Sequence, residues 1–170
     1  MDVATARYGS LTKVAMPSTL YVHRPLLNGH TLALWAKRAG FKSIIPPADM
    51  HVTIAFSRRP VDWMKIGEGY PVTPKLVIFE GGPRNLTRFD GGAVVLVFDS
   101  AELRWRNEDI RAAGASWDWP DYHPHVTLSY ETGDLDVDSI APYQGRLVFG
   151  PETWEPVEED WKTNIAERKT

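Results

Sequence analysis

The triplet His-Val-Thr occurs twice in this chain, at residues 51–53 and 125–127, and it constrains the fold more than any other feature. Chance would supply about 0.03 copies in a chain of this composition. An apolar residue follows each copy, Ile54 in the first and Leu128 in the second, within a segment of strand-like composition. The repetition therefore predicts a duplicated unit that ends in a strand each time.

The spacing of other residues extends the repeat beyond the triplet. His51 and His125 lie 74 residues apart, and so do Gly40 and Gly114, each of which follows apolar residues at helical spacing. Strand, helix, glycine stop, proline-bearing loop and motif strand thus recur in register. We predict an α+β fold of two similar lobes, related by a pseudo-twofold axis, with a cleft where the motif strands meet.

Local signals place the two predicted helices. Asn28 is suited to the N-cap of the first helix, which Gly40 ends. Asp99 and Glu102 resemble a capping box at the start of the second helix, which Gly114 ends.

A strand gives each triplet a chemical meaning, because side chains at positions i and i+2 point to the same face. His51 then lies beside Thr53, and His125 beside Thr127. Two imidazoles that meet across a cleft supply a general acid and a general base near neutral pH, with no metal ion required. Two threonine hydroxyls can donate to an anionic oxygen held between them. The pattern leaves open which histidine is the base.

Composition limits the class of protein. The 170 residues include 43% hydrophobic and 24% charged residues, which is typical of one globular domain. We expect a single domain over residues 1–170, with a leader at 1–17, a core at 18–161 and a tail at 162–170. The net charge of −3 argues against binding of long nucleic acid, which needs a basic face.

The chain has no cysteine, which excludes disulfides and thiolate metal sites. We expect neither a metal ion nor another cofactor. The first residues lack the apolar core of a signal peptide, and no apolar run approaches the length of a membrane span. We therefore expect a cytoplasmic protein with no membrane partner.

The remaining histidines and the aromatic residues before the second motif are interpreted as structural. A lone histidine or aromatic residue is more often a packed or surface residue than part of a site. These residues are His23, His30, His123, Trp117, Trp119 and Tyr122.

Two His-x-Thr triplets on equivalent strands, one in each lobe, resemble the defining pattern of the 2H phosphoesterase superfamily. The flanking sequence is similar to that of the phage-encoded anti-CBASS enzymes over roughly residues 18–161. The segments that carry this resemblance are Leu20-Tyr21-Val22, Trp35-Ala36-Lys37, Gly40-Phe41, residues 50–54, Ser57-Arg58, residues 124–130, Pro142-Tyr143, Gly145 and residues 149–152.

The resemblance implies a bilobal α+β fold with two antiparallel sheets, outer helices and a central cleft. It implies metal-independent hydrolysis of 3′–5′ bonds in cyclic di- and trinucleotide signals such as 3′,3′-cGAMP, which blocks CBASS antiviral signalling. A phage-encoded enzyme of this kind would act in the host cytoplasm. His51, Thr53, His125 and Thr127 carry over as catalytic residues.

Substrate-binding residues carry over less uniformly. The family's tyrosine on the first strand corresponds to Tyr21. For the glutamate and tryptophan near the C-terminus we favour Glu155 and Trp161, with Glu152 as the competing glutamate.

Two other functions remain open from the sequence. The first is another 2H activity, such as opening 2′,3′-cyclic phosphates on RNA ends. The second is a non-catalytic module that sequesters a cyclic nucleotide. The preferred cyclic nucleotide and the oligomeric state are not predicted.

Overall fold

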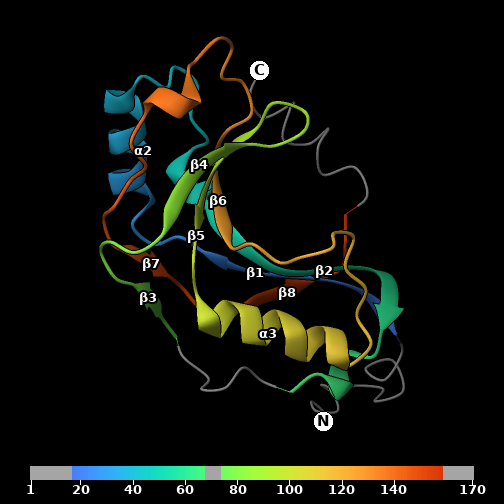
Figure 1. The fold of residues 1–170 in the computed structure, drawn as a ribbon. Coiled ribbons are helices and arrows are strands. Elements are labelled where there is room, and N and C mark those ends of the chain that lie inside the picture. Colours follow the sequence, from blue (N-terminus) through green and yellow to red (C-terminus); the bar gives the residue numbers. More distant parts are fainter. Residues whose placement is uncertain (1–16, 68–73, 159–170) are drawn as a thin grey trace.

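A six-stranded antiparallel sheet forms the centre of the protein, seen here in a computed structural model that describes residues 17–67 and 74–158. The strand order is β4-β5-β6-β2-β1-β8 (Figure 1). The strands are β1 (Ser18–Pro25), β2 (His51–Val61), β4 (Arg84–Arg88), β5 (Val94–Phe98), β6 (His125–Ser129) and β8 (Thr153–Glu155).

A small antiparallel sheet and two helices complete the fold. The small sheet pairs β3 (Leu76–Ile78) with β7 (Leu147–Phe149). The helices are α2 (Gly29–Ala39) and α3 (Ala101–Ala112), with short 3₁₀ turns η1 (Pro47–Asp49), η2 (Trp63–Lys65) and η3 (Val137–Ser139). The predicted α+β fold with two antiparallel sheets and outer helices is confirmed.

The two motif strands meet at the middle of the larger sheet. Val52 of β2 and Val126 of β6 are the one residue pair in that antiparallel contact. On either side of this pair the three-stranded halves β4-β5-β6 and β2-β1-β8 diverge, so the ribbon in Figure 1 opens between them. The pseudo-twofold axis therefore relates the halves of the larger sheet, and not the larger sheet to the smaller one.

The predicted repeat is present both in the order of the elements and in the glycines that end the helices. The order β1-α2-β2 recurs as β5-α3-β6. Gly40 and Gly114, which follow the two helices, have φ angles of 113° and 117°. Glycine reaches this left-handed region without steric cost, which explains why it ends both helices.

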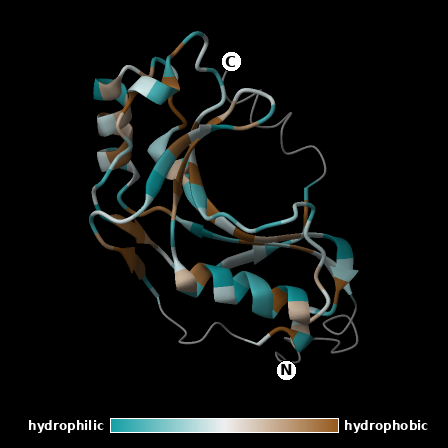
Figure 2. Cartoon of the chain, viewed as in Figure 1, coloured by the Kyte–Doolittle hydropathy of each residue, from teal (hydrophilic) through white to brown (hydrophobic). Residues whose placement is uncertain are grey.

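Hydrophobic side chains from both halves form a continuous core. Val52, Ile54, Val126 and Leu128 are fully buried. Burial of each such side chain contributes about 1.5–3 kcal/mol relative to exposure. Figure 2 shows that β3 and β7 are largely hydrophobic, whereas α3 carries hydrophilic residues along much of its length. No helix of the described residues is long and apolar enough to cross a membrane.

Both predicted helix starts differ in detail. Asn28 precedes α2, but its side chain makes no capping bond. It instead bonds to the backbone of Arg146 and Val148, which ties α2 to β7. The N-cap of α3 is Ser100, whose hydroxyl accepts from Leu103 N at 3.2 Å, and not Asp99. Serine's short hydroxyl reaches the free N–H group directly.

Candidate active site

The four motif side chains share one face of the larger sheet. Residues 51–55 and 125–129 have the same burial pattern, in which the histidine and threonine are half-buried and the valine between them is fully buried. The alternation predicted from strand geometry is therefore confirmed. Because β2 and β6 are antiparallel, each histidine lies toward the threonine of the other motif.

A β-bulge follows each motif at an equivalent position. In β2, Thr53 pairs with His23 and Ala55 with Val22, which leaves Ile54 as the extra residue. In β6, Thr127 pairs with Val95 and Ser129 with Val94, which leaves Leu128 as the extra residue. Each bulge lies directly after a motif threonine and changes which later residue faces the cleft.

The two motif histidines are held by the same backbone contact. The Nδ1 atom of His51 lies 2.8 Å from the carbonyl oxygen of Asp49, and that of His125 lies 2.9 Å from the carbonyl oxygen of His123. A carbonyl only accepts, so Nδ1 carries the hydrogen in both neutral rings. Nε2 is then the basic atom of each ring.

Burial favours the neutral form of both rings. It lowers the pKa of His51, and repulsion from His23 and His125 lowers it further, against the hydrogen bond to Asp49. It likewise lowers the pKa of His125, against the hydrogen bond to the His123 carbonyl oxygen, and repulsion from the His123 side chain lowers it further.

Tyr21 contacts the first motif from β1. Its hydroxyl lies 2.9 Å from Nε2 of His51 and 3.5 Å from Oγ1 of Thr53. Burial raises the pKa of Tyr21 to about 12, so the hydroxyl remains protonated near neutral pH. It therefore donates to Nε2 of neutral His51. Among the described residues, no such partner faces Nε2 of His125.

His23 and Glu155 extend this cluster, although the sequence pattern favours a structural or surface role for His23. The His23 ring stacks on Tyr21 at 4.4 Å and lies edge-on to His51 at 5.6 Å. Its Nε2 donates to Oε2 of Glu155 at 2.6 Å. His23 is two residues from Tyr21 on β1, so strand alternation puts the two side chains on the same face.

The other predicted binding residues have different surroundings. Both carboxylate oxygens of Glu152 are bound within the protein, to Arg106 at 2.8 and 3.0 Å and to Trp154 Nε1 at 3.0 Å. Glu155 is more open, with 47% of its side chain exposed. Trp161 lies outside the described residues. The catalytic and binding roles assigned from the sequence stay predictions.

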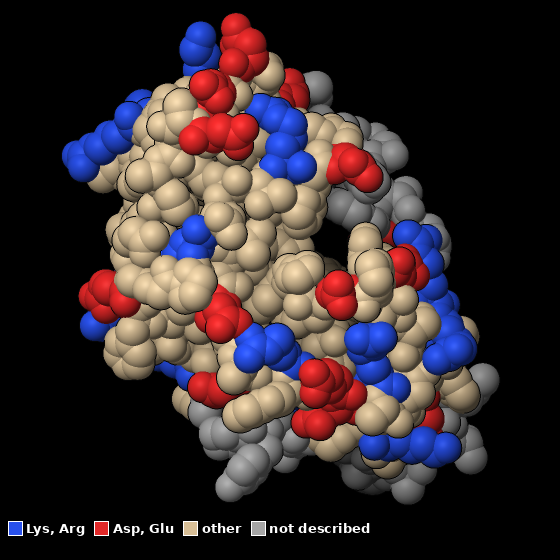
Figure 3. Space-filling model, viewed as in Figure 1, with Lys and Arg blue, Asp and Glu red and all other residues tan. Residues whose placement is uncertain are grey.

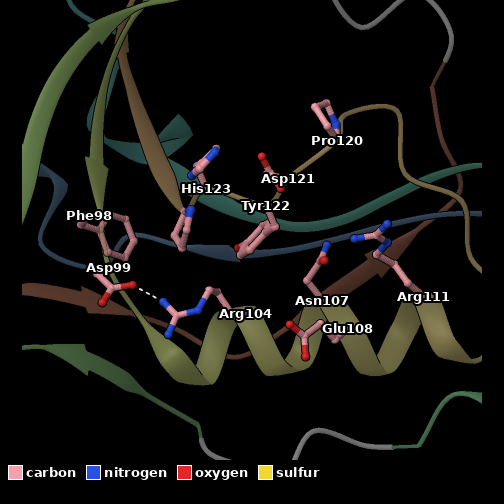
Figure 4. Close-up of a pocket in the computed structure, with 11 residues that line it drawn as sticks. Phe98, Asp99, Arg104, Asn107, Glu108, Arg111, Pro120, Asp121, Tyr122 and His123 are labelled. Carbon is pink, nitrogen blue, oxygen red and sulfur yellow. Dashed lines mark hydrogen bonds and ion pairs between the residues drawn. The ribbon is translucent and has the colours of Figure 1, made fainter.

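A separate pocket of about 350 Å³ lies between α3 and residues 120–124 (Figure 4). Its lining includes Arg104, Asn107, Tyr122 and His123, and none of the four motif residues. Arg104 is paired with Asp99 in this pocket. The pocket therefore lies beneath the loop that leads into β6 and outside the histidine cluster.

Charge around the cleft is mixed. On the face shown in Figure 3, acidic and basic side chains are interspersed around a hollow between the two halves. No group of three or more His, Asp or Glu side chains within residues 17–67 and 74–158 is arranged to hold a metal ion.

Comparison with known protein families agrees with this geometry, in which two strands carry equivalent His-x-Thr motifs, histidine contacts and bulges. The family model of the anti-CBASS protein Acb1 matches residues 18–164. The chain belongs to the Acb1 family. The resemblance inferred from the motifs is thereby confirmed.

Bacterial and phage members of the family are similar to this chain. The Acb1 protein of Caulobacter sp. (strain RHG1) is 48% identical over 155 residues, which are 90% of this chain and 25% of that protein. The Acb1 protein of Enterobacteria phage T4 is 34% identical over 122 residues, 71% of this chain and 75% of the phage protein. This chain thus spans about a quarter of the length of its Caulobacter relative.

Solved phosphoesterase structures share the fold of this Acb1 family member. E. coli LigT complexed with NADP⁺ superposes with a TM-score of 0.57 at 15% identity, covering 84% of this chain and 96% of that chain. E. coli LigT complexed with 3′-AMP gives a TM-score of 0.55 at 14% identity over the same shares. At this identity the likeness establishes the fold alone.

Proposed function

We propose that this protein is a metal-independent phosphodiesterase that hydrolyses 3′–5′ bonds in cyclic di- and trinucleotide signals and thereby blocks CBASS signalling. The observation that carries the proposal is the pair of His-x-Thr strands that meet at Val52 and Val126, each with its histidine anchored through Nδ1. Family membership supports the class of substrate.

The reaction needs one neutral and one protonated histidine. A neutral imidazole takes a proton from the attacking oxygen, which is the 2′-hydroxyl of the nucleotide or a water molecule. That oxygen forms a bond to phosphorus while the P–O5′ bond breaks. The other histidine, protonated, gives its proton to the leaving 5′-oxygen, so charge and protons balance with no metal ion in the scheme.

The neighbouring hydroxyls fit the charge that this displacement creates. Thr53 and Thr127 lie beside the histidines on the same face, where they would donate to the non-bridging phosphate oxygens. Tyr21 donates to Nε2 of His51 and holds that ring in a fixed orientation. Glu155, with its exposed carboxylate held by His23, is the better placed glutamate for a ribose hydroxyl or a nucleobase N–H.

The deciding experiment is incubation of the protein with 3′,3′-cGAMP in excess EDTA, followed by mass spectrometry. We expect linear dinucleotide from the unaltered protein and intact 3′,3′-cGAMP with His51→Ala. Intact ligand released on heating of the unaltered protein would instead indicate a sequestering module. Absence of both cleavage and binding would favour a 2′,3′-cyclic phosphate on RNA as the substrate.

A further inference from the structure

The bulge in β2 brings an aromatic side chain onto the cleft face beside the histidine cluster. Without the extra residue Ile54, the alternation from His51 and Thr53 would place Ala55 on that face. With it, Ala55 is fully buried and Phe56 pairs with Tyr21 across the strands. Their ring centres lie 5.7 Å apart in an edge-on arrangement.

Trp119 continues this row toward solvent. Its ring centre lies 6.4 Å from that of Phe56, and 52% of the residue is exposed. Two ring contacts therefore connect Trp119 to Tyr21, whose hydroxyl bonds Nε2 of His51. The sequence pattern favoured packing within the loop for Trp119, but half of this residue faces water.

The loop that carries Trp119 is fixed from several sides. Tyr122 donates from its hydroxyl to the carbonyl oxygen of Thr53 at 2.7 Å. Trp117 contacts the rings of both Trp119 and Tyr122, and its Nε1 donates to the Asp121 carbonyl oxygen at 3.1 Å. The indole of Trp119 is thus presented by a braced loop, which lowers the entropic cost of binding a ligand.

Arg58 links the loop to the strand. Its Nε donates to Oδ2 of Asp118 at 2.7 Å, and its guanidinium carbon lies 5.4 Å from the centre of the Phe56 ring. This contact ties the residue before Trp119 to the end of β2.

Exposure alone would mean little, because single exposed hydrophobic residues are common. Trp105 on the outer surface of α3 is 61% exposed, and the described part of the chain shows no ring contact for it. Trp119 differs because it ends a continuous aromatic row that begins at a site histidine. Tyr21 itself offers less surface to a base, because His23 already covers one face of its ring at 4.4 Å.

We propose that Trp119, backed by Phe56, is a stacking platform for one nucleobase of the bound cyclic oligonucleotide. This inference rests on the proposed function, since it names where that ligand places a base. Aromatic faces accept any nucleobase, so the platform would add affinity with little base preference.

The test compares steady-state kinetics of 3′,3′-cGAMP hydrolysis by Trp119→Ala with those of the unaltered enzyme. We expect KM to rise about 5- to 150-fold while kcat changes by less than about threefold, which is the range for loss of one stacked base. Trp119→Phe should restore most of the affinity, and Trp119→Leu should not. Trp105→Ala is the matched control, because it removes a tryptophan of similar or greater exposure on α3.

A binding readout keeps the test valid where a variant unfolds more easily. In a His125→Asn background, which slows turnover, the fluorescence of a cyclic dinucleotide containing 2-aminopurine should be quenched on binding. Quenching should persist with Trp105→Ala and be lost with Trp119→Leu.

Each result bears on one proposal or on both. An unaltered enzyme that cleaves 3′,3′-cGAMP, together with an unchanged KM for Trp119→Ala, would overturn the stacking platform and leave the phosphodiesterase standing. Failure of the unaltered protein both to bind and to cleave 3′,3′-cGAMP would overturn the two together.

Discussion

Replacement of either motif histidine should abolish catalysis with little change in fold. Asparagine is the sharpest replacement, because its Nδ2 can donate to the carbonyl oxygen of Asp49 or His123 as Nδ1 does. We expect His51→Asn and His125→Asn each to lower kcat about 10²- to 10⁴-fold, the range for loss of a general acid or base. His30→Asn, at an exposed position of α2, is the control. Product formation measured by mass spectrometry checks this, and a near-normal rate for either variant would remove that histidine from the mechanism.

The pH dependence of hydrolysis should reflect the lowered pKa of both rings. Catalysis requires one neutral and one protonated imidazole, so kcat/KM is largest between their two pKa values. Burial is the main cause that lowers both pKa values below the ordinary one of about 6.5, and repulsion from neighbouring histidines adds to it for each ring. We therefore expect a bell-shaped kcat/KM profile with its maximum below about pH 6.5. A bound anionic phosphodiester stabilises imidazolium and so raises the pKa of both histidines in the enzyme–substrate complex. The kcat profile should therefore peak at a higher pH than the kcat/KM profile. A kcat/KM maximum above pH 7.5 would contradict the assignment.

Tyr21 provides a separate test at the residue scale. Its hydroxyl donates to Nε2 of neutral His51 and so stabilises the neutral ring. Tyr21→Phe removes this donor, so the pKa of His51 should rise by up to about one unit, since a hydrogen bond contributes about 0.5–1.5 kcal/mol. The imidazole ¹⁵N chemical shifts of His51 during a pH titration measure this directly. A fall in the pKa would mean that the tyrosine oxygen mainly accepts from imidazolium.

At the scale of elements, replacement of one C-terminal glutamate should lower stability, and replacement of the other should weaken binding. Arg106 of α3 and Glu152 before β8 form a buried pair, with 8% and 14% of their side chains exposed. Glu152→Gln leaves that arginine charge uncompensated, so we expect the free energy of unfolding to fall by about 3 kcal/mol. Glu155→Gln should instead raise KM and leave the thermal midpoint nearly unchanged. Calorimetry checks the predicted stabilities and hydrolysis kinetics checks the predicted KM values. A raised KM with unchanged stability for Glu152→Gln would instead make Glu152 the binding residue.

The pair of Arg106 and Glu152 also predicts how the free energy of unfolding changes at acid pH. Burial alone would raise the pKa of Glu152, but the hydrogen bonds from Arg106 and Trp154 outweigh it and lower that pKa. The contribution of Glu152 to the free energy of unfolding is therefore complete above its unfolded-state pKa of about 4.3. It is lost as the pH falls through the lower pKa of the folded state. Unfolding of Glu152→Gln should depend less on pH across that window.

The repeated elements were predictable because their signals are local. Two His-Val-Thr triplets and two glycines 74 residues apart were enough to place the motif strands and the helix ends. The bulges at Ile54 and Leu128 were not, because an extra residue is defined only by the partner strand. Asn28 likewise bonds residues far along the chain, and local propensity carries no information on that choice.

In the candidate site, too, some features were predictable from local sequence and others were not. The faces of His51, Thr53, His125 and Thr127 followed from strand alternation. The contact between His23 and Glu155 depends on β8 pairing with β1 across 132 residues of sequence. The exposure of Trp119 depends on how its loop is braced. Neither feature has a signal within a short window of sequence.

At the scale of the whole molecule, charge distribution bears on the size of the ligand. The chain carries 19 basic and 22 acidic residues, and on the face around the cleft in Figure 3 the two kinds are interspersed. A long nucleic acid would need many phosphate contacts along a continuous basic track. A cyclic dinucleotide presents two phosphates, which a few hydroxyls and imidazoles between the two halves can accommodate.

Salt should therefore weaken binding of a cyclic dinucleotide far less than binding of a long nucleic acid. Each phosphate contact lowers the logarithm of the binding constant by about 0.7–0.9 per tenfold rise in salt. Two contacts predict that the Kd of 3′,3′-cGAMP rises at most about tenfold between 50 and 200 mM salt, whereas six to ten contacts would weaken binding about 10³- to 10⁵-fold. Calorimetric titration of His125→Asn, which slows turnover, measures this directly, and an RNA with a 2′,3′-cyclic phosphate end is the comparison ligand. A shallow slope for 3′,3′-cGAMP with weak binding of the RNA would fit a compact site between the two halves. Tight RNA binding with a steep slope would instead mean that RNA ends are the substrate.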